Sequence, residues 1–451
     1  MKIRGDKMEY ILQIKDMSIS FVKDNIKSEV VKNLNLNIKK GEILAIVGET
    51  GSGKTIFTHG LMGILPENAV FEGEIYFDGI KIQPNVENFI LIPQTTTYLD
   101  PLMKISKQIS LKDNELSKKS KNLYPFQCSG GMIRNALFSL VYEKNAPIIV
   151  ADEPTVALDL KTALKILESL KNLANDGKSV ILITHDIDLA VNIADRVAVF
   201  KEGKILEVAD KADFFNNTLK NDYTKELFRA LPQNDFEILD LQEKNENFDK
   251  SDVLMCENLS FKYKKCEMLF ENLNFKLKQG ERVCIFAKSG FGKSTFAKIL
   301  AGYEKPTKGT ILPDEKDGFN PVQMIFQHPE MSVNPKWTVY EILNEGGDFD
   351  RELLAKFGID ESYFDRLPSE LSGGELQRIC IIRSIKKDTK FLICDEITTM
   401  LDAITQAKIW KNILEEVTKR NIGLLVITHN EHLAHKICEK VIDFEKMCGG
   451  E

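Results

Sequence analysis

Two stretches of this chain place glycines, a lysine and a hydroxyl residue at a spacing that suits phosphate binding. The first, residues 48–55, matches G-x-x-x-x-G-K-[ST], in which glycines let consecutive backbone N–H groups face one anion at a helix N-terminus. The lysine of this motif reaches the β- and γ-phosphates of a nucleotide, and the hydroxyl binds Mg²⁺. The residues predicted to act in this loop are Gly48, Gly51, Ser52, Gly53, Lys54 and Thr55.

A second loop, residues 287–294, repeats the motif with one change. Ala287 stands where the first loop has Gly48. If this position requires a positive φ, the added Cβ costs about 1 kcal/mol, and the second phosphate nest is predicted to be weaker. Two such loops in one chain predict an internal repeat. The residues predicted to bind phosphate or Mg²⁺ here are Ser289, Gly290, Gly292, Lys293, Ser294 and Thr295.

Side chains that suit phosphoryl transfer follow each loop in the same order. Each half has a glutamine after an apolar run, an Asp-Glu pair after another, and a Thr-His pair after a third. Phosphoryl transfer depends on positioning, charge neutralisation and a carboxylate for the attacking water more than on covalent help. The first set is Gln94, Asp152, Glu153 and His185, and the second is Gln327, Asp395, Glu396 and His429.

The elements that must position these residues alternate between strands and helices. The apolar runs 43–47 and 283–286 predict buried strands that enter the two loops, and helix-compatible sequence leaves each loop. Strands that alternate with helices in this way predict a parallel sheet with crossover helices. Before the first loop, residues 10–21 and 30–38 predict two further strands. The expected fold class is therefore α/β.

The repeat also predicts the domain organisation. From the glycine pair onward, the two halves keep nearly the same spacing, so that Ser129 matches Ser372 and His185 matches His429. The segment between the glutamine and the glycine pair is shorter in the first half. We expect one domain over residues 1–235, a polar and charged linker over 236–251, and a second domain over 252–451.

Composition excludes several classes of protein. The 451 residues carry a net charge of −7 and no long basic stripe, which argues against a nucleic-acid footprint. The basic cluster at residues 118–121 is expected to be a solvated face, with contact to anionic lipid headgroups as the alternative. No apolar run approaches the ~20 residues of a membrane span, and the N-terminus has no signal-peptide pattern. Any membrane role is therefore expected to be peripheral.

The eight cysteines predict a reducing compartment, because they are scattered and form no C-x-x-C pair. Cys284 and Cys394 lie inside apolar runs and are predicted to be small core residues.

The ordered set of loop, glutamine, Ser-Gly-Gly, Asp-Glu and Thr-His resembles the ATP-binding cassette (ABC) ATPases, and it does so twice. Residues 371–378, Leu-Ser-Gly-Gly-Glu-Leu-Gln-Arg, are close to the family's LSGGQ-x-Q-R signature. The resemblance implies two tandem P-loop NTPase domains. Each would combine an ABC-type RecA-like core with an antiparallel β subdomain and a small helical subdomain.

The resemblance also implies a role for each site residue. Thr55, Asp152 and Gln94, with Ser294, Asp395 and Gln327 in the second half, would serve Mg²⁺. Glu153 and Glu396 would orient and deprotonate water, and His185 and His429 would contact the γ-phosphate. Signature residues Ser129 and Gly131, with Ser372 and Gly374, would bind ATP. Phe21 and Tyr263 would stack on adenine, with an ordinary core role as the alternative.

In this family, two cassettes pack head to tail, so each P-loop would face the signature of the other cassette. The first P-loop would face residues 372–374, and the second would face residues 129–131. Two departures, Ala287 and Cys128, fall together in the second site. We therefore expect two competent but unequal sites, with the first one stronger.

Local strings at residues 98–102, 222–232 and 332–339 resemble the dipeptide, oligopeptide and nickel importer branch. This resemblance implies a subunit that binds and hydrolyses ATP to energise import of peptides or of nickel or another metal. Its partners would be two integral-membrane permease subunits and an extracytoplasmic substrate-binding protein, with no nucleic acid and no homo-oligomer required. Its place would be the cytoplasmic face of the cell (inner) membrane. The cysteine cluster that often ends members of this branch is not found.

Two alternatives stay open. A soluble two-cassette ATPase acting on ribosomes or translation has a similar layout, but such proteins usually carry a long basic linker, and residues 236–251 are short and acidic-leaning. A vitamin or cobalt importer type with fused cassettes would differ in its membrane partner. His429, His432 and His435 have a spacing that invites a nickel site, but we expect His429 to serve the γ-phosphate and the other two to be surface or packing residues.

Overall fold

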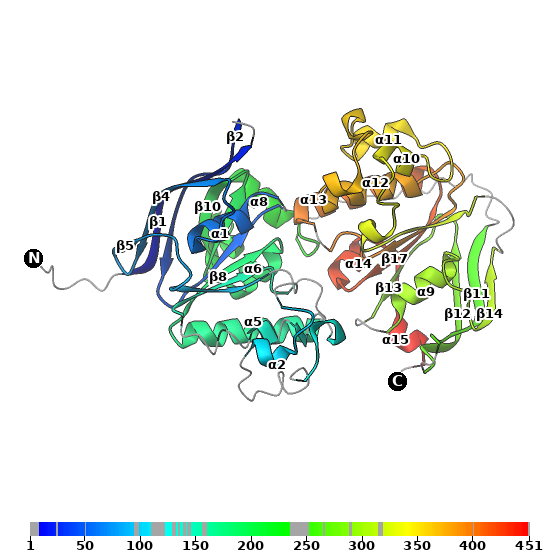
Figure 1. Cartoon of the computed structure of the whole chain (residues 1–451). Helices are drawn as coiled ribbons and strands as arrows, with labels where there is room; N and C mark the ends of the chain where they lie inside the picture. Colours follow the sequence, from blue (N-terminus) through cyan, green and yellow to red (C-terminus); the bar gives the residue numbers. More distant parts are fainter. Residues whose placement is uncertain are drawn as a thin grey trace, which may run out of the picture. The chain divides into compact units, whose positions relative to one another are not determined.

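The computed structural model describes residues 9–23, 26–49, 51–93, 99–109, 122–128, 132–133, 136–138, 141, 146–155, 160–234, 252–264, 267–287, 291–313, 319–399 and 401–449. The chain divides into two compact units, Met1–Phe228 and Arg229–Glu451 (Figure 1). Each unit contains one of the two P-loops.

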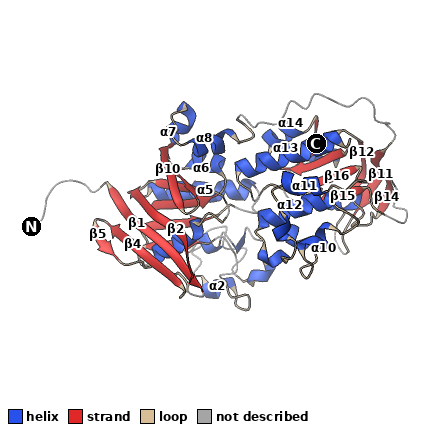
Figure 2. Cartoon of the chain, turned by 90° about the horizontal axis from the view of Figure 1, so that it is seen from above, coloured by secondary structure: helices blue, strands red, loops and turns tan. Residues whose placement is uncertain are grey.

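The first unit combines an antiparallel and a mainly parallel sheet. Its described strands form a four-stranded sheet in the order β2-β1-β4-β5, labelled in Figure 2. Further strands form a six-stranded sheet in the order β10-β9-β3-β8-β7-β6. The strands are β1 (Tyr10–Lys23), β2 (Ile26–Lys39), β3 (Ile43–Val47), β4 (Ala69–Phe77), β5 (Ile80–Ile82), β6 (Phe89–Ile92), β7 (Ile148–Asp152), β8 (Ser179–Thr184), β9 (Arg196–Lys201) and β10 (Lys204–Asp210). The helices are α1 (Lys54–Met62), α2 (Ile105–Gln108), η2 (Pro125–Gln127), α5 (Leu160–Asn175), α6 (Ile187–Ile193), α7 (Lys211–Asn216) and α8 (Asp222–Arg229).

The central strands β3, β7 and β8 are buried along their whole length, as their continuous apolar sequences require in a sheet covered on both faces. They run parallel, with Val47 beside Thr184 and Asp152 beside Ile183. The carboxyl ends of all three strands therefore meet at one edge of the sheet. This register gathers the P-loop, the Asp-Glu pair and the Thr-His pair of the first unit.

The second unit repeats this arrangement with fewer described strands: a three-stranded sheet in the order β12-β11-β14 and a five-stranded sheet in the order β15-β16-β17-β13-β18. The strands are β11 (Val253–Phe261), β12 (Phe270–Lys278), β13 (Arg282–Phe286), β14 (Lys308–Leu312), β15 (Val322–Ile325), β16 (Phe391–Asp395), β17 (Gly423–Thr428) and β18 (Lys440–Asp443). The helices are α9 (Lys293–Leu300), η3 (Pro329–Met331), α10 (Val339–Leu343), α11 (Arg351–Lys356), η4 (Glu361–Tyr363), η5 (Pro368–Glu370), α12 (Gly373–Ser384), α13 (Ala403–Lys419), α14 (Glu431–Ile437) and α15 (Phe444–Met447).

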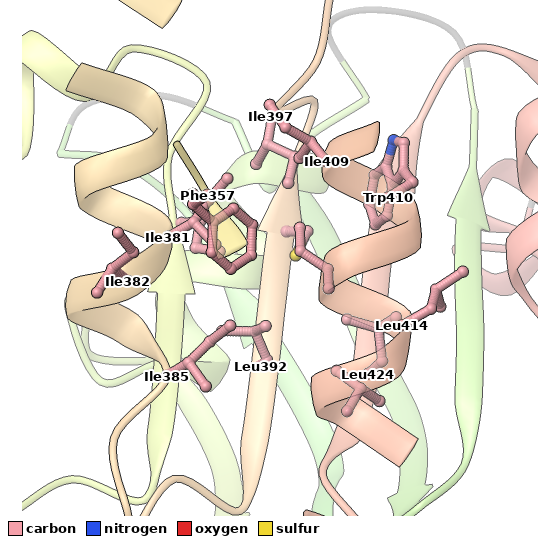
Figure 3. Close-up of a cluster of buried hydrophobic side chains, with 14 of the residues drawn as sticks. Phe357, Ile381, Ile382, Ile385, Leu392, Ile397, Ile409, Trp410, Leu414 and Leu424 are labelled. Carbon is pink, nitrogen blue, oxygen red and sulfur yellow. The ribbon is translucent and has the colours of Figure 1, made fainter. Parts of the chain in front are cut away.

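An apolar cluster joins the helices of the second unit to its parallel sheet. Figure 3 shows Ile381 from α12 and Trp410 from α13 in this cluster, together with Leu392 of β16. Trp410 is 1% exposed, and its indole Nε1 donates a hydrogen bond to the Thr398 hydroxyl at 3.1 Å. The segment after the Asp-Glu pair is thus held by a buried side chain of α13.

The predicted fold class is confirmed by these two tandem α/β units with antiparallel sheets. Cys284 and Cys394 are fully buried core residues, as predicted. The expected linker, residues 236–251, and the basic cluster, residues 118–121, lie outside the described residues.

Candidate nucleotide site

The first P-loop has the backbone that its glycines predict. Gly51 and Gly53 have φ angles of +82° and +106°, in the left-handed region that glycine enters at little cost, and Gly53 is the N-cap of α1. Lys54 is buried, and its Nζ donates hydrogen bonds of 2.7 Å to the backbone oxygens of Gly48 and Glu49. A buried ammonium group at a helix N-terminus can bind phosphate oxygens.

The first position of each P-loop has a different backbone conformation from the positive φ considered in the sequence analysis. Neither Gly48 nor Ala287 has a positive φ, so the expected backbone cost of Ala287 is wrong. Gly48 is required for another reason, because a Cβ there would lie 2.0 Å from the backbone oxygen of Phe200 on β9. Ala287 is itself 2% exposed, so the second unit accommodates the methyl group inside its core. Lys293 Nζ donates to the Ala287 oxygen at 2.6 Å.

An aspartate lies beside the hydroxyl residue of each loop. The Thr55 hydroxyl donates to Asp152 Oδ2 at 3.1 Å, and Ser294 hydrogen-bonds Asp395. Burial raises the pKa of both aspartates to about 6, against the lowering effect of these hydroxyls. Within the described residues, the Oδ1 atoms of both aspartates are buried with no hydrogen-bond partner. A buried, unsatisfied carboxylate oxygen next to a hydroxyl is a suitable ligand set for Mg²⁺, so these residues fit that ion.

Each catalytic candidate pair of glutamate and histidine is brought together at the sheet edge. Nδ1 of His185 lies 2.9 Å from Oε1 of Glu153, and Nδ1 of His429 lies 3.5 Å from Oε1 of Glu396. Burial raises the pKa of Glu396, but the hydrogen bond and charge of His429 and the charge of Lys293 outweigh it, so the net shift is downward. Glu396 is therefore ionised at neutral pH, as a base must be.

Both glutamates also share an unusual backbone conformation that the sequence does not reveal. Glu153 has a φ of +48° and Glu396 a φ of +49°, a region that side chains with a Cβ enter at a cost of about 1–2 kcal/mol. Each is fixed there by its N–H group, which donates to the backbone oxygen of Ile183 and of Ile427, respectively. Strain of this kind concentrates at functional sites.

The glutamine and signature residues of the second unit occupy defined positions. Gln327 Nε2 donates to Glu396 Oε2 at 3.1 Å, which ties the segment after β15 to the glutamate. Ser372 is the N-cap of α12, and its hydroxyl accepts from the Glu375 N–H in a capping box. Gly373 and Gly374 lie in the first turn of the same helix, so the Ser-Gly-Gly sequence forms the N-terminus of α12.

The two aromatic candidates differ in their surroundings. Tyr263 is 44% exposed, and its ring meets Phe261 edge to face at 4.9 Å. Its hydroxyl lies 3.0 Å from the hydroxyl of Thr295, so these two predicted site residues contact each other. Phe21 lies on β1 and is half-buried.

Five predicted site residues lie outside the described residues: Gln94, Ser129, Gly131, Ser289 and Gly290. Sequence reasoning also missed a contact of the first P-loop. The Tyr223 hydroxyl on α8 donates to the Glu49 carboxylate at 2.8 Å. Tyr223 lies in one of the strings that resemble the importer branch, but that string gave no signal of a P-loop partner.

Comparison with known proteins identifies the family of this chain. The family model described as "ABC transporter" matches residues 31–156 and 270–399, together more than half of the chain. Both matches begin before a P-loop and extend past the following Asp-Glu pair. The chain therefore belongs to the ABC transporter family, and its two ATP-binding domains make it an ATPase.

Curated relatives match almost the whole chain. The "Glutathione import ATP-binding protein GsiA" of Escherichia coli is 27% identical over 527 residues, covering 96% of this chain and 84% of that protein. The "Peptidoglycan transport ATP-binding protein YejF" of Agrobacterium fabrum is 26% identical over 502 residues, covering 96% of this chain and 90% of that protein.

Solved structures share the fold. The archaeal ribosome recycling factor, solved in complex with the archaeal ribosomal stalk protein, superposes with a TM-score of 0.66 at 22% identity and covers 94% of this chain. The superposition shows that the two proteins share the tandem-cassette fold. Among the helices that the structure describes, none combines the length and apolar character needed to cross a membrane.

Proposed function

We propose that this chain is the ATP-hydrolysing subunit of an ABC importer and works through separate membrane permease subunits. The observation that carries the proposal is the match over 96% of the chain to relatives whose names denote import or transport of glutathione and peptidoglycan. Those names favour a peptide-like cargo over nickel. The tandem-cassette likeness to a ribosome recycling factor supports the alternative, action on ribosomes, at the level of fold alone.

We propose the following division of labour at the first site. Lys54 binds the terminal phosphates of ATP, and Thr55 and Asp152 hold Mg²⁺, which when bound would neutralise phosphate charge. Glu153 accepts a proton from the attacking water. His185 lies 2.9 Å from the Glu153 carboxylate, orients that carboxylate and contacts the γ-phosphate. At the second site Lys293, Ser294, Asp395, Glu396 and His429 take the same roles.

The remaining predicted residues complete the proposal. Gln94 and Gln327 would link Mg²⁺ to the permease-facing surface, Phe21 and Tyr263 would stack on adenine, and the two Ser-Gly-Gly sequences would bind ATP. The cassettes would span residues 1–235 and 252–451 with a linker at 236–251. One chain would serve each transporter at the cytoplasmic face of the membrane, together with two permeases and an extracytoplasmic substrate-binding protein.

Two exposed apolar side chains mark the surfaces that we propose for the permeases. Leu102 is 85% exposed and Met331 is 84% exposed. Leu102 lies eight positions after Gln94, and Met331 lies four positions after Gln327. Single exposed apolar residues are common on protein surfaces, so their position rather than their exposure supports the assignment. The surrounding segments differ in length between the units, which favours unequal docking of the two permeases.

Affinity purification from detergent-solubilised membranes tests the proposal. A tagged chain should recover two multi-span permease subunits, whose identity would narrow the cargo. Leu102→Glu and Met331→Glu should each reduce this recovery, whereas Ile80→Glu, at a 70% exposed position on β5, should not. Recovery of ribosomes instead of permeases would overturn the importer proposal and support the translation-type alternative.

A further inference from the structure

The helix α8 contacts the first P-loop through one side chain. The Tyr223 hydroxyl donates a hydrogen bond of 2.8 Å to Oε1 of Glu49, the second residue of that loop. Both side chains are half-buried, so solvent competes only partly for this bond. Hydrogen bonds to charged groups are stronger than neutral ones, and this one links segments that are 174 residues apart in the chain.

Tyr223 is itself fixed by its neighbours. The Nζ atom of Lys201 lies 3.9 Å from the centre of the Tyr223 ring, a cation–π contact from the end of β9. The Tyr223 N–H donates to the Asn221 side chain at 3.0 Å. The Glu207 carboxylate on β10 accepts the N–H groups of Lys220 and Asn221 at 2.8 and 3.1 Å. The start of α8 is therefore anchored to β10, and the Tyr223 hydroxyl has a defined position.

Glu49 is held on its other side by the P-loop lysine. Its backbone oxygen accepts a 2.7 Å hydrogen bond from Lys54 Nζ, while its carboxylate is held by Tyr223. A carboxylate at this position adds a negative charge to a loop whose N–H groups and lysine would bind phosphates, and like charges at short range repel. The corresponding residue of the second P-loop is Lys288, of opposite charge.

We propose that Tyr223 is a positioning residue for the nucleotide at the first P-loop. By binding the Glu49 carboxylate, Tyr223 keeps that negative charge directed toward α8 and away from the phosphates and from Lys54. The second P-loop, with a lysine at the same position, has no such charge to restrain. This inference rests on the proposed binding of ATP at residues 48–55.

Equilibrium binding of ATP with Mg²⁺ to the full chain tests the inference, with Lys293→Ala in every variant to silence the second P-loop. Tyr223→Phe should raise the ATP dissociation constant about tenfold, because the loss of a hydrogen bond to a charged group changes an equilibrium constant by about this factor. In a Glu49→Gln background, the same Tyr223→Phe change should alter the ATP dissociation constant less than twofold, because no charge remains to be restrained.

A matched control separates this role from a general loss of stability. The Tyr76 hydroxyl donates to Glu74 at 2.7 Å on the antiparallel sheet, so Tyr76→Phe removes the same type of bond outside the P-loop and should leave ATP binding unchanged. An equal loss of affinity from Tyr223→Phe in both backgrounds, or no loss in either, would overturn the inference while leaving the first site intact. A parent chain with Lys293→Ala that binds no ATP would overturn the first site itself.

Discussion

Nδ1 of His185 lies 2.9 Å from Oε1 of Glu153, and the two side chains are only 12% and 9% exposed. The matching pair in the second unit is 3.5 Å apart, and His429 is 59% exposed. A buried pair lies in a lower local dielectric than an exposed pair, so its hydrogen bond is electrostatically stronger and its orientation is better defined. We therefore predict from this difference between the two pairs that the first site turns over ATP faster than the second.

We predict that Glu153→Gln lowers the kcat of ATP hydrolysis more than Glu396→Gln does. Removal of a general base typically costs 10²–10⁴-fold at the affected site, so the remaining turnover should report the other site. Steady-state ATPase assays of the two single variants and the double variant measure this. If Glu396→Gln abolished turnover while Glu153→Gln left it intact, the ranking would be wrong.

The positive φ angles of Glu153 and Glu396 predict that glycine is tolerated better than alanine at either position. Glu153→Gly should be about 1 kcal/mol more stable than Glu153→Ala, because both lose the carboxylate but only glycine relieves the backbone. For a unit of this size the difference corresponds to about 2–4 °C in Tm. Calorimetry of the two variants measures it, and an alanine variant as stable as the glycine variant would contradict it.

The raised pKa of Asp395 predicts that Asp395→Asn increases the stability of the protein in a pH-dependent way. Burial raises the folded-state pKa to about 6 from 3.8, so the stability that this group contributes is present in full below pH 3.8 and is lost as pH rises through 6. The loss amounts to about 3 kcal/mol at most. Asp395→Asn should therefore be more stable than the parent chain at pH 8, with the gain shrinking toward pH 4.

Urea unfolding at several pH values in the absence of divalent cations measures this gain. A less stable Asp395→Asn variant at pH 8 would contradict the assignment of burial as the dominant cause.

The close approach of Gly48 to Phe200 predicts that Gly48→Ala destabilises the protein much more than Ala287→Gly does. Gly48→Ala places a Cβ against a backbone oxygen, and the required shift should cost at least about 2 kcal/mol and weaken ATP binding at the first site. Ala287→Gly relieves no backbone strain and should change stability by less than about 1 kcal/mol through lost packing. Thermal unfolding and ATP titration of both variants test the pair, and a tolerated Gly48→Ala would refute the steric explanation.

Much of the fold and site could be predicted because their signals are local in sequence. Apolar runs that end in Asp-Glu or Thr-His predict parallel strands, and the carboxyl ends of parallel strands meet, so Asp152 and His185 had to lie near the P-loop. The positive φ of Glu153 could not be predicted, since it depends on the bond of its N–H group to Ile183 on the neighbouring strand.

Contacts between distant segments were also beyond the sequence. The role of Gly48 was misjudged because the constraint comes from Phe200, a residue of β9 that no motif marks. The Tyr223–Glu49 hydrogen bond joins the P-loop to a helix near the end of the first unit, and residue types alone do not specify such a partner.

The left-handed backbone at Glu153 and Glu396 has a consequence for protein engineering. Among replacements selected only for heat resistance, glycine should be favoured at both positions, because it relieves backbone strain in each unit independently. The selected proteins would fold well and still hold nucleotide, but they would lack the carboxylates proposed to activate water. A thermostability screen of this chain therefore needs a turnover assay beside it.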